Sequence, residues 1–334
     1  MTIFFLIFIL FIIIFIFYIK FDLISNYLTF FDKPDGKLKR HSKPTSLLGG
    51  LLILINLYLI IFSLRLFDID NSTFDSNFEI VVIILGTLFY LIGLFDDLKN
   101  LTPNIKLLLL ILSVLLIVYL FPQINLELIK ISFLEKNYYF NQYSFLFTTL
   151  SFLLLVNAMN MFDGINLQLI LFCSFVLILF IMKGFIPIFF ILLFISLIFL
   201  GLLNFKNKIF LGDGGAYLLS SLLGSTFIYQ YKKFDNYFFG DEVFVILIIP
   251  AIDMLRLFIE RLVNKTHPFK GDLNHLHHIV DNFTKNKNLT IIITIGACII
   301  PTIFLFMGFK TYNILILTVI IYISLISYLK LKNK

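Results

Sequence analysis

Residues 185–203 read Phe-Ile-Pro-Ile-Phe-Phe-Ile-Leu-Leu-Phe-Ile-Ser-Leu-Ile-Phe-Leu-Gly-Leu-Leu and contain no charged side chain. A helix that crosses a bilayer needs about 20 mostly apolar residues, so this stretch is long enough to be one. Similar runs follow one another along the whole 334-residue chain. The recurrence predicts a protein that crosses a membrane many times.

Composition supports this class, because 60% of the residues are hydrophobic and only 14% are charged. A soluble protein carries roughly a quarter charged residues. Backbone groups in lipid must be satisfied within the segment, so the apolar runs should be helices. We predict one all-α membrane domain over residues 1–334, a bundle of ten or eleven helices. The expected segments are 2–19, 47–66, 79–95, 105–121, 144–160, 166–183, 185–203, 214–231, 243–260, 289–308 and 312–329.

Positive charge predicts the orientation of these segments. With the N-terminus outside and the C-terminus in the cytoplasm, most of the 26 lysines and arginines fall in cytoplasmic loops, as the positive-inside rule requires. The polar stretch 123–142 then lies outside, where its alternating pattern favours a small hairpin. Four polar motifs, at 96–97, 157–166, 212–215 and 275–278, all fall on the cytoplasmic side. We therefore expect a single active site at that face.

Asp96 and Asp97 end the third apolar run. A solvated helix end would explain them, but carboxylates are unfavourable at a helix C-terminus. With Lys99 and Lys106 close by, the pair suits a site for phosphate and Mg²⁺, since Mg²⁺ takes carboxylate and phosphate oxygens.

Asn157, Asn160 and Asp163 follow at intervals of one helical turn and share a face. Such residues are costly at the end of an apolar helix unless they serve a ligand. Gly164 then gives the backbone freedom to turn.

The glycine-rich turn 212–215 leads into the eighth run. Backbone N–H groups at a helix N-terminus bind anions, so this turn suits a phosphate. Asp213 either caps the helix, holds a metal ion, or does both.

The longest polar stretch is 250–278. Asp253 and Arg256 share a helix face and could simply pair, while 4 of the 5 histidines lie in 267–278. Histidine-rich tracts bind transition metals, but histidines among Arg and Lys also suit a cationic cradle for phosphates. The early loop 39–50 is basic and contains a Pro-Thr and a Gly-Gly pair. It is either an ordinary cytoplasmic loop that follows the positive-inside rule, or a loop with a defined backbone conformation.

Taken together and in this order, these motifs resemble those of the polyprenyl-phosphate N-acetylhexosamine-1-phosphate transferase family (glycosyltransferase family 4). The resemblance rests on the basic loop 39–50, the Asp96-Asp97 pair, the 157–166 segment, Phe210-Leu-Gly-Asp-Gly-Gly and His275-Leu-His-His. The last motif is similar to the WecA and TagO branch, whereas the related MraY proteins carry a Pro-Leu-His-His-His pattern.

The resemblance implies transfer of an N-acetylated amino-sugar 1-phosphate, GlcNAc-1-phosphate by default, from a UDP-sugar to undecaprenyl phosphate in the bacterial inner membrane, with release of UMP. The lipid-linked product would begin an envelope glycan such as O-antigen. No nucleic-acid partner is expected, and a homodimer is among the open alternatives for the oligomeric state.

The same resemblance assigns roles to individual residues. It makes Asp96 and Asp97 catalytic and gives Mg²⁺, or Mn²⁺, to Asp213 and Asp163. The residues implied in binding nucleotide and phosphate are Asn157, Asn160, Gly164, Asn166, Asn204, Phe210, His275, His277 and His278. The cations implied for the lipid phosphate are Lys106, Arg40, His41, Arg256 and Arg261.

This chain departs from the family pattern at Asn166, Ala216 and Ser46, where the family has Asp, Ser and Pro. An amide can both donate and accept, as the edge of uracil requires, so Asn166 reads as a base-recognition position. An MraY-like activity on a muramyl-pentapeptide nucleotide, a non-catalytic lipid-binding relative and a secondary transporter are the alternatives. A transporter would place polar groups near the bilayer midplane, often within a repeat.

Overall fold

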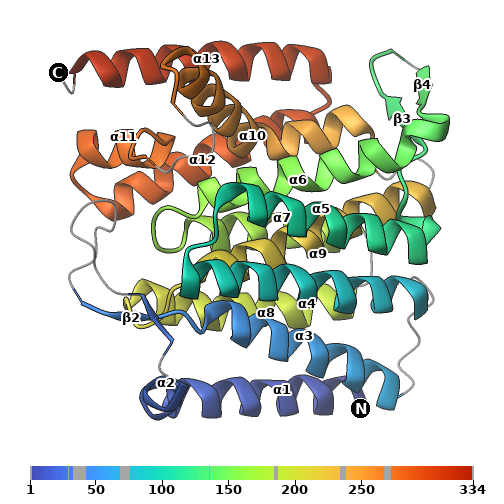
Figure 1. Ribbon diagram of the computed structural model, residues 1–334, viewed down its shortest axis with the longest axis vertical. Coiled ribbons are helices and arrows are strands. Elements are labelled where there is room, and N and C mark those ends of the chain that lie inside the picture. The colour runs from blue at the N-terminus through green and yellow to red at the C-terminus, as the bar shows by residue number, and fades with distance from the viewer. Residues whose placement is uncertain are drawn as a thin grey trace. The chain divides into compact units, whose positions relative to one another are not determined.

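The computed structural model describes residues 2–28, 30–32, 43–67, 76–134, 136–183, 187–233, 238–266 and 272–332. In these ranges the chain forms helices α1 to α13 and two short antiparallel strand pairs (Figure 1). The all-α prediction is confirmed.

Every apolar segment expected from the sequence coincides with a helix. These helices are α1 Thr2–Ile19, α3 Gly49–Leu66, α4 Ser76–Lys99, α5 Pro103–Leu120, α6 Ser144–Phe162, α7 Gln168–Met182, α8 Pro187–Phe205, α9 Gly212–Lys233, α10 Gly240–Val263, α12 Lys287–Phe306 and α13 Thr311–Lys332. Two shorter helices, α2 Phe21–Leu28 and α11 Leu276–Thr284, were not expected. Both are amphipathic and short, so neither has the long apolar run by which the other helices were found.

Among the described residues, 7 helices are long and apolar enough to cross a membrane, namely α3, α4, α5, α6, α8, α12 and α13. The pair α1–α2, bent by 71°, counts as an eighth if it forms one span. α7 is apolar but has only 15 residues. α10 carries Asp253, Arg256, Glu260 and Arg261 in its second half, and these charges keep it out of the set. The polytopic prediction is confirmed, with fewer clear spans than the eleven expected.

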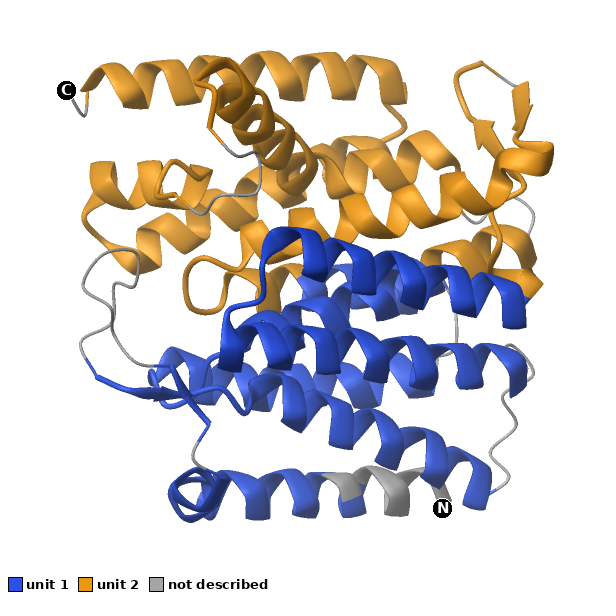
Figure 2. Ribbon diagram, viewed as in Figure 1, with its two compact units in different colours: residues 1–121, 173–225 blue, residues 122–172, 226–334 orange. Residues whose placement is uncertain are grey.

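The chain divides into two compact units, each built from two stretches: unit 1 is 1–121 with 173–225, and unit 2 is 122–172 with 226–334 (Figure 2). One division follows α5, and the other two fall within α7 and α9. A single domain over 1–334 stays a prediction.

Unit 1 contains α1 to α5 and α8, with most of α7 and α9. α3 packs against α4 and α8, and α4 packs against α5. The strands β1 Phe31–Asp32 and β2 Thr45–Ser46 pair at the N-terminal end of α3. Side chains such as Leu57 and Phe89 are fully enclosed between these helices.

Unit 2 contains α6, α10, α11, α12 and α13, with short 3₁₀ turns at Pro122–Ile124 and Asn141–Tyr143. α10 packs against α6, α12 and α13, and α11 packs against α12 and α13. The strands β3 Leu128–Ile131 and β4 Lys136–Tyr139 form an antiparallel hairpin, so the hairpin predicted within 123–142 is confirmed. Within this unit, the hairpin and α11 lie at opposite ends of the long helices (Figure 1).

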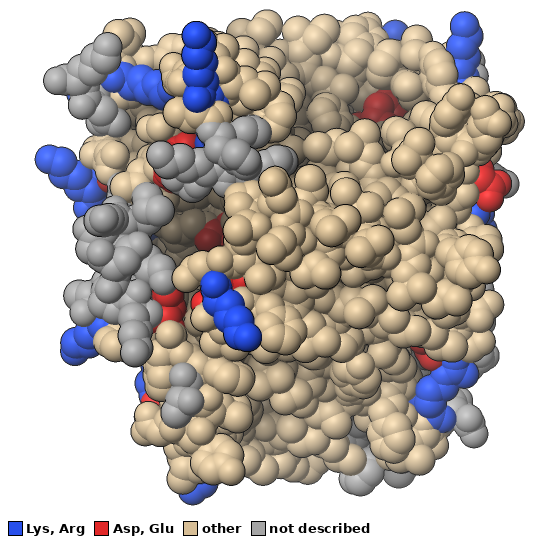
Figure 3. All heavy atoms as spheres, in the orientation of Figure 1, with Lys and Arg blue, Asp and Glu red and all other residues tan. Residues whose placement is uncertain are grey.

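The surface has the character of a protein that contacts lipid. Large apolar side chains are widely exposed along the helices, for example Phe62 on α3 and Ile320 on α13. On the face in Figure 3, uncharged side chains cover most of the area, and most Lys and Arg side chains lie toward its margins.

Candidate functional site

The acidic cluster, defined as Asp96, Asp97, Lys106 and Asp213, lies in unit 1 where α4 ends and α5 and α9 begin. Asp96 is 8% exposed and pairs with the ammonium group of Lys106. The Lys106 Nζ also lies 3.5 Å from Oδ2 of Asp213. A short α4–α5 turn brings Lys106 to Asp96, because α5 starts directly after Thr102 with Pro103 in its first turn. The structure brings these side chains together, and their role in a site stays a prediction.

Asp97 holds the start of α9. Its Oδ1 accepts the backbone N–H of Asp213 at 3.1 Å, and its Oδ2 accepts that of Gly214 at 3.3 Å. The sequence predicted that this helix N-terminus would bind an anion. The anion that it binds in the structure is the carboxylate of Asp97, contributed by α4. Asp213 itself does not cap α9; it lies in the first turn with its side chain 30% exposed.

Glycines allow the backbones of α3, α4 and α9 to approach one another closely at the start of α9. A Cβ on Gly93 would lie 2.4 Å from the backbone nitrogen of Gly214, and one on Gly50 would lie 2.6 Å from that of Gly215. Gly212 has φ +71° and leaves room for Asp97, whose Oδ2 would be 2.6 Å from an added Cβ. The glycine-rich motif therefore serves close packing of α3, α4 and α9 around the acidic cluster.

The segment that leads into α9 is fixed by the end of the early loop. Phe210 donates its N–H to the Ser46 carbonyl at 2.7 Å, and its own carbonyl accepts the N–H of Gly49 at 3.1 Å. Asn204, 4% exposed, donates its amide to the carbonyl of Ile209 at 2.8 Å. These contacts confirm the shaped loop for residues 45–50. They give Asn204 and Phe210 structural contacts next to Asp213, and their predicted nucleotide contacts stay a prediction. Arg40 and His41 lie outside the described residues.

The cluster has the chemistry that Mg²⁺ requires. Three carboxylates interact with one another, and two of them, Asp96 and Asp213, pair with the ammonium group of Lys106. A divalent cation would balance the excess negative charge. In the described part of the chain no three His, Cys, Asp or Glu side chains form a metal cage on their own. Mg²⁺ usually binds through one or two carboxylates together with substrate phosphates, so the donor set fits.

The amide segment of unit 2 lies at the C-terminal end of α6. Asn157 donates its amide to the carbonyl of Leu153 at 2.7 Å, and Asp163 ends the helix. The side chains of Asn157, Asn160, Asp163 and Asn166 are all partly exposed. They are therefore accessible to a ligand, as the sequence predicted. Their roles stay a prediction.

The histidine cluster, defined as His275, His277 and His278, lies at the start of α11 in unit 2. All three side chains are buried. The rings of His275 and His277 stack with centroids 5.4 Å apart, and those of His277 and His278 meet edge to face at 4.2 Å. The segment after α6 presses against this cluster, because a Cβ on Gly164 would lie 1.8 Å from Nε2 of His277. Gly164 thus provides space for a ring, rather than the backbone freedom that the sequence suggested.

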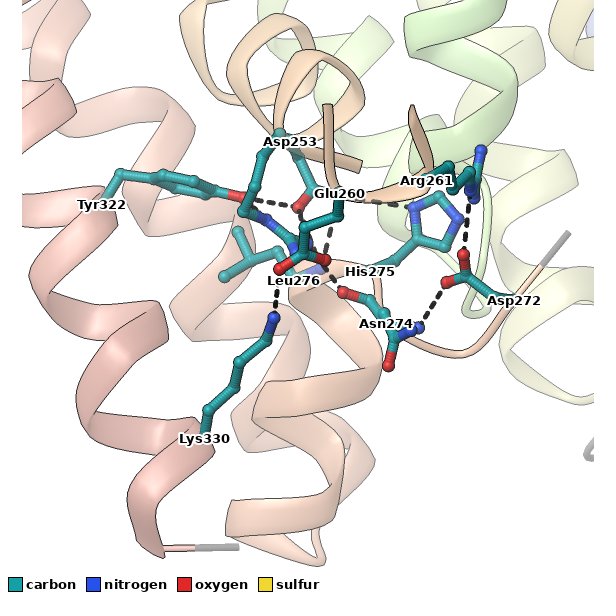
Figure 4. A network of polar contacts seen from close by, with 10 residues as sticks. Asp253, Glu260, Arg261, Asp272, Asn274, His275, Leu276, Tyr322 and Lys330 are labelled. Carbon is teal, nitrogen blue, oxygen red and sulfur yellow. Dashed lines mark hydrogen bonds and ion pairs between the residues drawn. The ribbon is translucent and has the colours of Figure 1, made fainter. Parts of the chain in front are cut away.

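Two predicted phosphate-binding cations are bound by carboxylates instead (Figure 4). Arg256 binds Asp253 at 2.8 Å and Glu260 at 2.9 Å, and donates further to Tyr322 and to the carbonyl of Asn274. The predicted Asp253–Arg256 pair is therefore confirmed. Arg261, 7% exposed, binds Asp272 at 2.9 Å. In this arrangement both guanidinium groups anchor the loop before α11, and their contact with lipid phosphate stays a prediction.

The sequence did not reveal two buried tyrosines near the acidic cluster or one tyrosine of the network around Asp253. Tyr90 and Tyr217 are buried beside the acidic cluster, and Tyr322 donates its hydroxyl to Asp253. Each lies inside an apolar helix, where tyrosine reads as a packing residue. A hydroxyl facing a carboxylate leaves no mark in a hydrophobic pattern.

The amino-acid sequence around this site matches a known protein family. The model of glycosyl transferase family 4 matches residues 79–231, a stretch that contains every residue of the acidic cluster and the amide segment. Over this segment the chain is similar to glycosyl transferase family 4. The family 4 match stops before the histidine cluster, which lies further along the chain.

Proteins similar to this chain include three curated bacterial proteins. One, from Thermotoga maritima, is named undecaprenyl-phosphate alpha-N-acetylglucosaminyl 1-phosphate transferase and is 26% identical over 276 residues, 79% of this chain and 78% of that protein. A Salmonella typhi protein of the same name is 27% identical, with 80% and 74% covered. A Bacillus subtilis protein, named a probable undecaprenyl-phosphate N-acetylglucosaminyl 1-phosphate transferase, is 23% identical, with 78% and 72% covered.

Proposed function

We propose that this membrane enzyme transfers an N-acetylated amino-sugar 1-phosphate from a UDP-sugar to undecaprenyl phosphate at the cytoplasmic face of the bacterial inner membrane. The acidic cluster carries the proposal, because three carboxylates and a lysine at helix ends suit a reaction between two phosphate groups. The names of its relatives support undecaprenyl phosphate as the acceptor and N-acetylglucosamine 1-phosphate as the transferred group. UDP-GlcNAc is the default donor.

In this reaction an oxygen of the lipid phosphate attacks the phosphorus bonded to the sugar. A new phosphorus–oxygen bond forms, the bond to the leaving UMP breaks, and a polyprenyl-diphosphate sugar results. Asp213, with Asp163 as the predicted second ligand, would hold Mg²⁺ or Mn²⁺. When bound, the ion supplies charge neutralisation and polarises phosphate oxygens.

The chain's own residues reduce the repulsion between the two anions and align them. Lys106 brings a positive charge beside Asp96 and Asp213. A phosphate monoester has a second pKa near 6, so the lipid phosphate is largely ionised at neutral pH. Deprotonation by Asp96 can therefore add little, and positioning should dominate. Asp97 supports the arrangement by holding the α9 N-terminus.

Direct attack by the lipid phosphate is favoured over an aspartyl-phosphate intermediate. Asp96 is buried and paired with Lys106, and both oxygens of Asp97 accept backbone N–H groups. Such engaged carboxylates are poor nucleophiles. Trapping labelled sugar phosphate on the protein without lipid acceptor would contradict this choice.

The decisive experiment incubates the solubilised protein with undecaprenyl phosphate and a panel of labelled UDP-sugars. We expect UMP release and an organic-soluble sugar diphosphate, with UDP-GlcNAc among the accepted donors, and neither product without lipid. Turnover only with a muramyl-pentapeptide nucleotide would favour an MraY-like activity. Binding without turnover would favour a binding protein, and uptake into vesicles without UMP release would favour a transporter.

A further inference from the structure

Asp253 is buried in α10 and its carboxylate is surrounded by donors. Its side chain is 4% exposed, and its Oδ1 accepts Arg256 Nη2 at 2.8 Å and the hydroxyl of Tyr322 at 2.5 Å. The backbone N–H of Leu276, in the first turn of α11, lies 3.2 Å from Oδ1 and 3.3 Å from Oδ2. Three helices, α10, α11 and α13, therefore meet at one carboxylate (Figure 4).

His275 faces the other side of this carboxylate. Its Nδ1 lies 3.4 Å from Oδ2 of Asp253, and its side chain is 9% exposed. An ionised carboxylate can only accept hydrogen bonds, so the ring nitrogen that faces it should carry the proton. The remaining nitrogen, Nε2, is then the one that can meet a ligand.

We propose that Asp253 is a positioning residue, which fixes the Nδ1–H tautomer and the ring orientation of His275, and that Tyr322 and Arg256 hold it in place for this role. The consequence for catalysis rests on the proposed function and on the predicted contact of His275 with a substrate phosphate. The consequence for the tautomer does not.

An ordinary Asp–Arg pair would not explain the arrangement. Pairing within α10 needs only Arg256, yet Asp253 also binds the backbone of α11 beside His275 and the hydroxyl of α13. The Asp253 carboxylate therefore contacts both the first turn of α11 and the ring of His275. A buried network of hydrogen bonds favours one geometry, because each broken bond leaves an unsatisfied polar group.

The first test reads the tautomer directly. The chain has 5 histidines, so ¹⁵N-histidine labelling in lipid nanodiscs should give few ring signals, and the loss of one in His275→Gln assigns it. At a pH where the ring is neutral, we expect His275 to carry its proton on Nδ1. Asp253→Asn should shift the proton wholly or partly to Nε2. An Nε2–H tautomer in the unmodified protein, or no change in Asp253→Asn, would overturn the proposal.

The second test measures how substitution of Asp253 changes the catalytic rate. Loss of a residue that orients a histidine typically lowers activity by about 10–100-fold, and we expect Asp253→Asn to lower kcat by that factor with little change in KM. Tyr322→Phe should cause a smaller loss in the same direction, and Asp253→Glu should recover part of the rate. Tyr328→Phe is the matched control, because Tyr328 is exposed on the same helix. A normal kcat in folded Asp253→Asn would contradict the role.

The two tests separate this inference from the proposed function. If the protein transfers no sugar phosphate but His275 shows the Nδ1–H tautomer, and Asp253→Asn changes it, positioning stands and the proposed function fails. If the protein transfers sugar phosphate but Asp253→Asn leaves the His275 tautomer unchanged, the positioning role is wrong and the proposed function stands. Thermal melting of each variant identifies any that do not fold.

Discussion

At the scale of single residues, the three carboxylates of the acidic cluster differ in what they already bind. Asp96 has the ammonium group of Lys106, and Asp97 has two backbone N–H groups. The Asp213 side chain is 30% exposed, against 9% for Asp96. Asp213 is therefore the carboxylate best placed to accept a metal ion from solution.

We predict that Asp213→Asn lowers turnover by about a hundredfold or more, because a metal ion supplies several kcal/mol of charge stabilisation in such reactions. Excess Mg²⁺ should not restore the rate, and Mn²⁺ binding, followed by electron paramagnetic resonance, should weaken. Asp22→Asn is the control, since the Asp22 side chain is exposed on α2, where it pairs with Lys208. Full activity in Asp213→Asn would disprove the metal assignment.

Gly164 gives a second prediction at this scale. An alanine Cβ would lie 1.8 Å from Nε2 of His277, so Gly164→Ala should displace the ring or the loop. We expect it to cost ~1–3 kcal/mol of stability, as overpacking typically does, and to reduce activity. Thermal unfolding and steady-state rates measure both effects.

Two comparisons make that result specific. Gly296→Ala in α12 should be neutral or stabilising, because nothing lies within 4 Å of the added Cβ. The double variant Gly164→Ala/His277→Ala should be no less stable than His277→Ala, since the clash partner is gone. If the stability lost in the double variant equals the sum of the two single losses, Gly164→Ala destabilises the protein by some means other than a clash with His277.

At this scale the sequence predicted residue types better than their partners. It grouped Asp96 with Lys106 correctly, since a turn between two helices brings such neighbours together. It could not show that Asp97 would bind the start of α9, because 116 positions separate Asp97 from Asp213 in the chain. Arg256 and Arg261 read as cations for a ligand, yet both bind carboxylates, and charge alone does not reveal its partner.

At the scale of elements, the β3–β4 hairpin is anchored to the start of α10 by one carboxylate. Asp241 is 7% exposed and accepts the N–H of Ser132 at 2.9 Å, the hydroxyl of Ser132 at 2.5 Å and the hydroxyl of Thr311. The position suits a carboxylate, because the N-terminus of a helix attracts negative charge. Hairpin, α10 and α13 are thereby joined within unit 2.

We predict that Asp241→Asn destabilises the protein by ~2 kcal/mol, the typical worth of a hydrogen bond to a charged group. The midpoint of thermal unfolding should fall, while kcat measured well below that midpoint should stay unchanged, because the hairpin lies at the other end of unit 2 from the histidine cluster. Exposed Asp22→Asn again provides the comparison. An unchanged midpoint would mean that the neutral amide of asparagine holds the hairpin as well as the carboxylate does.

At the scale of the whole molecule, the predicted orientation can be tested with a thiol label that does not cross membranes. Cys173 and Cys298 are fully buried, so background labelling should be low. We predict that Lys99→Cys and Asn282→Cys, both at exposed positions, react only after the inner face is opened. Tyr139→Cys, on the hairpin, should react in intact cells. Labelling of positions 99 and 282 from opposite sides would rule out one shared cytoplasmic face.

The helices were predictable because a long apolar run has few alternatives in lipid. α6, α8 and α12 lie within a few residues of their expected limits. The division of the contacts into two interleaved units was not predictable, because apolar runs look alike and do not say which helices pack together. The bend after α1 and the short α11 were also missed, since each depends on polar contacts made elsewhere in its unit.

The bond between Tyr322 and Asp253 has a consequence for biosynthesis. α10 and His275 leave the ribosome before α13 does, so Asp253 meets its hydroxyl partner only after that later helix has entered the membrane and packed. Until then the carboxylate can bind Arg256 and the start of α11, but not the hydroxyl of α13. The network that holds His275 would therefore gain its last hydrogen bond only as α13 docks.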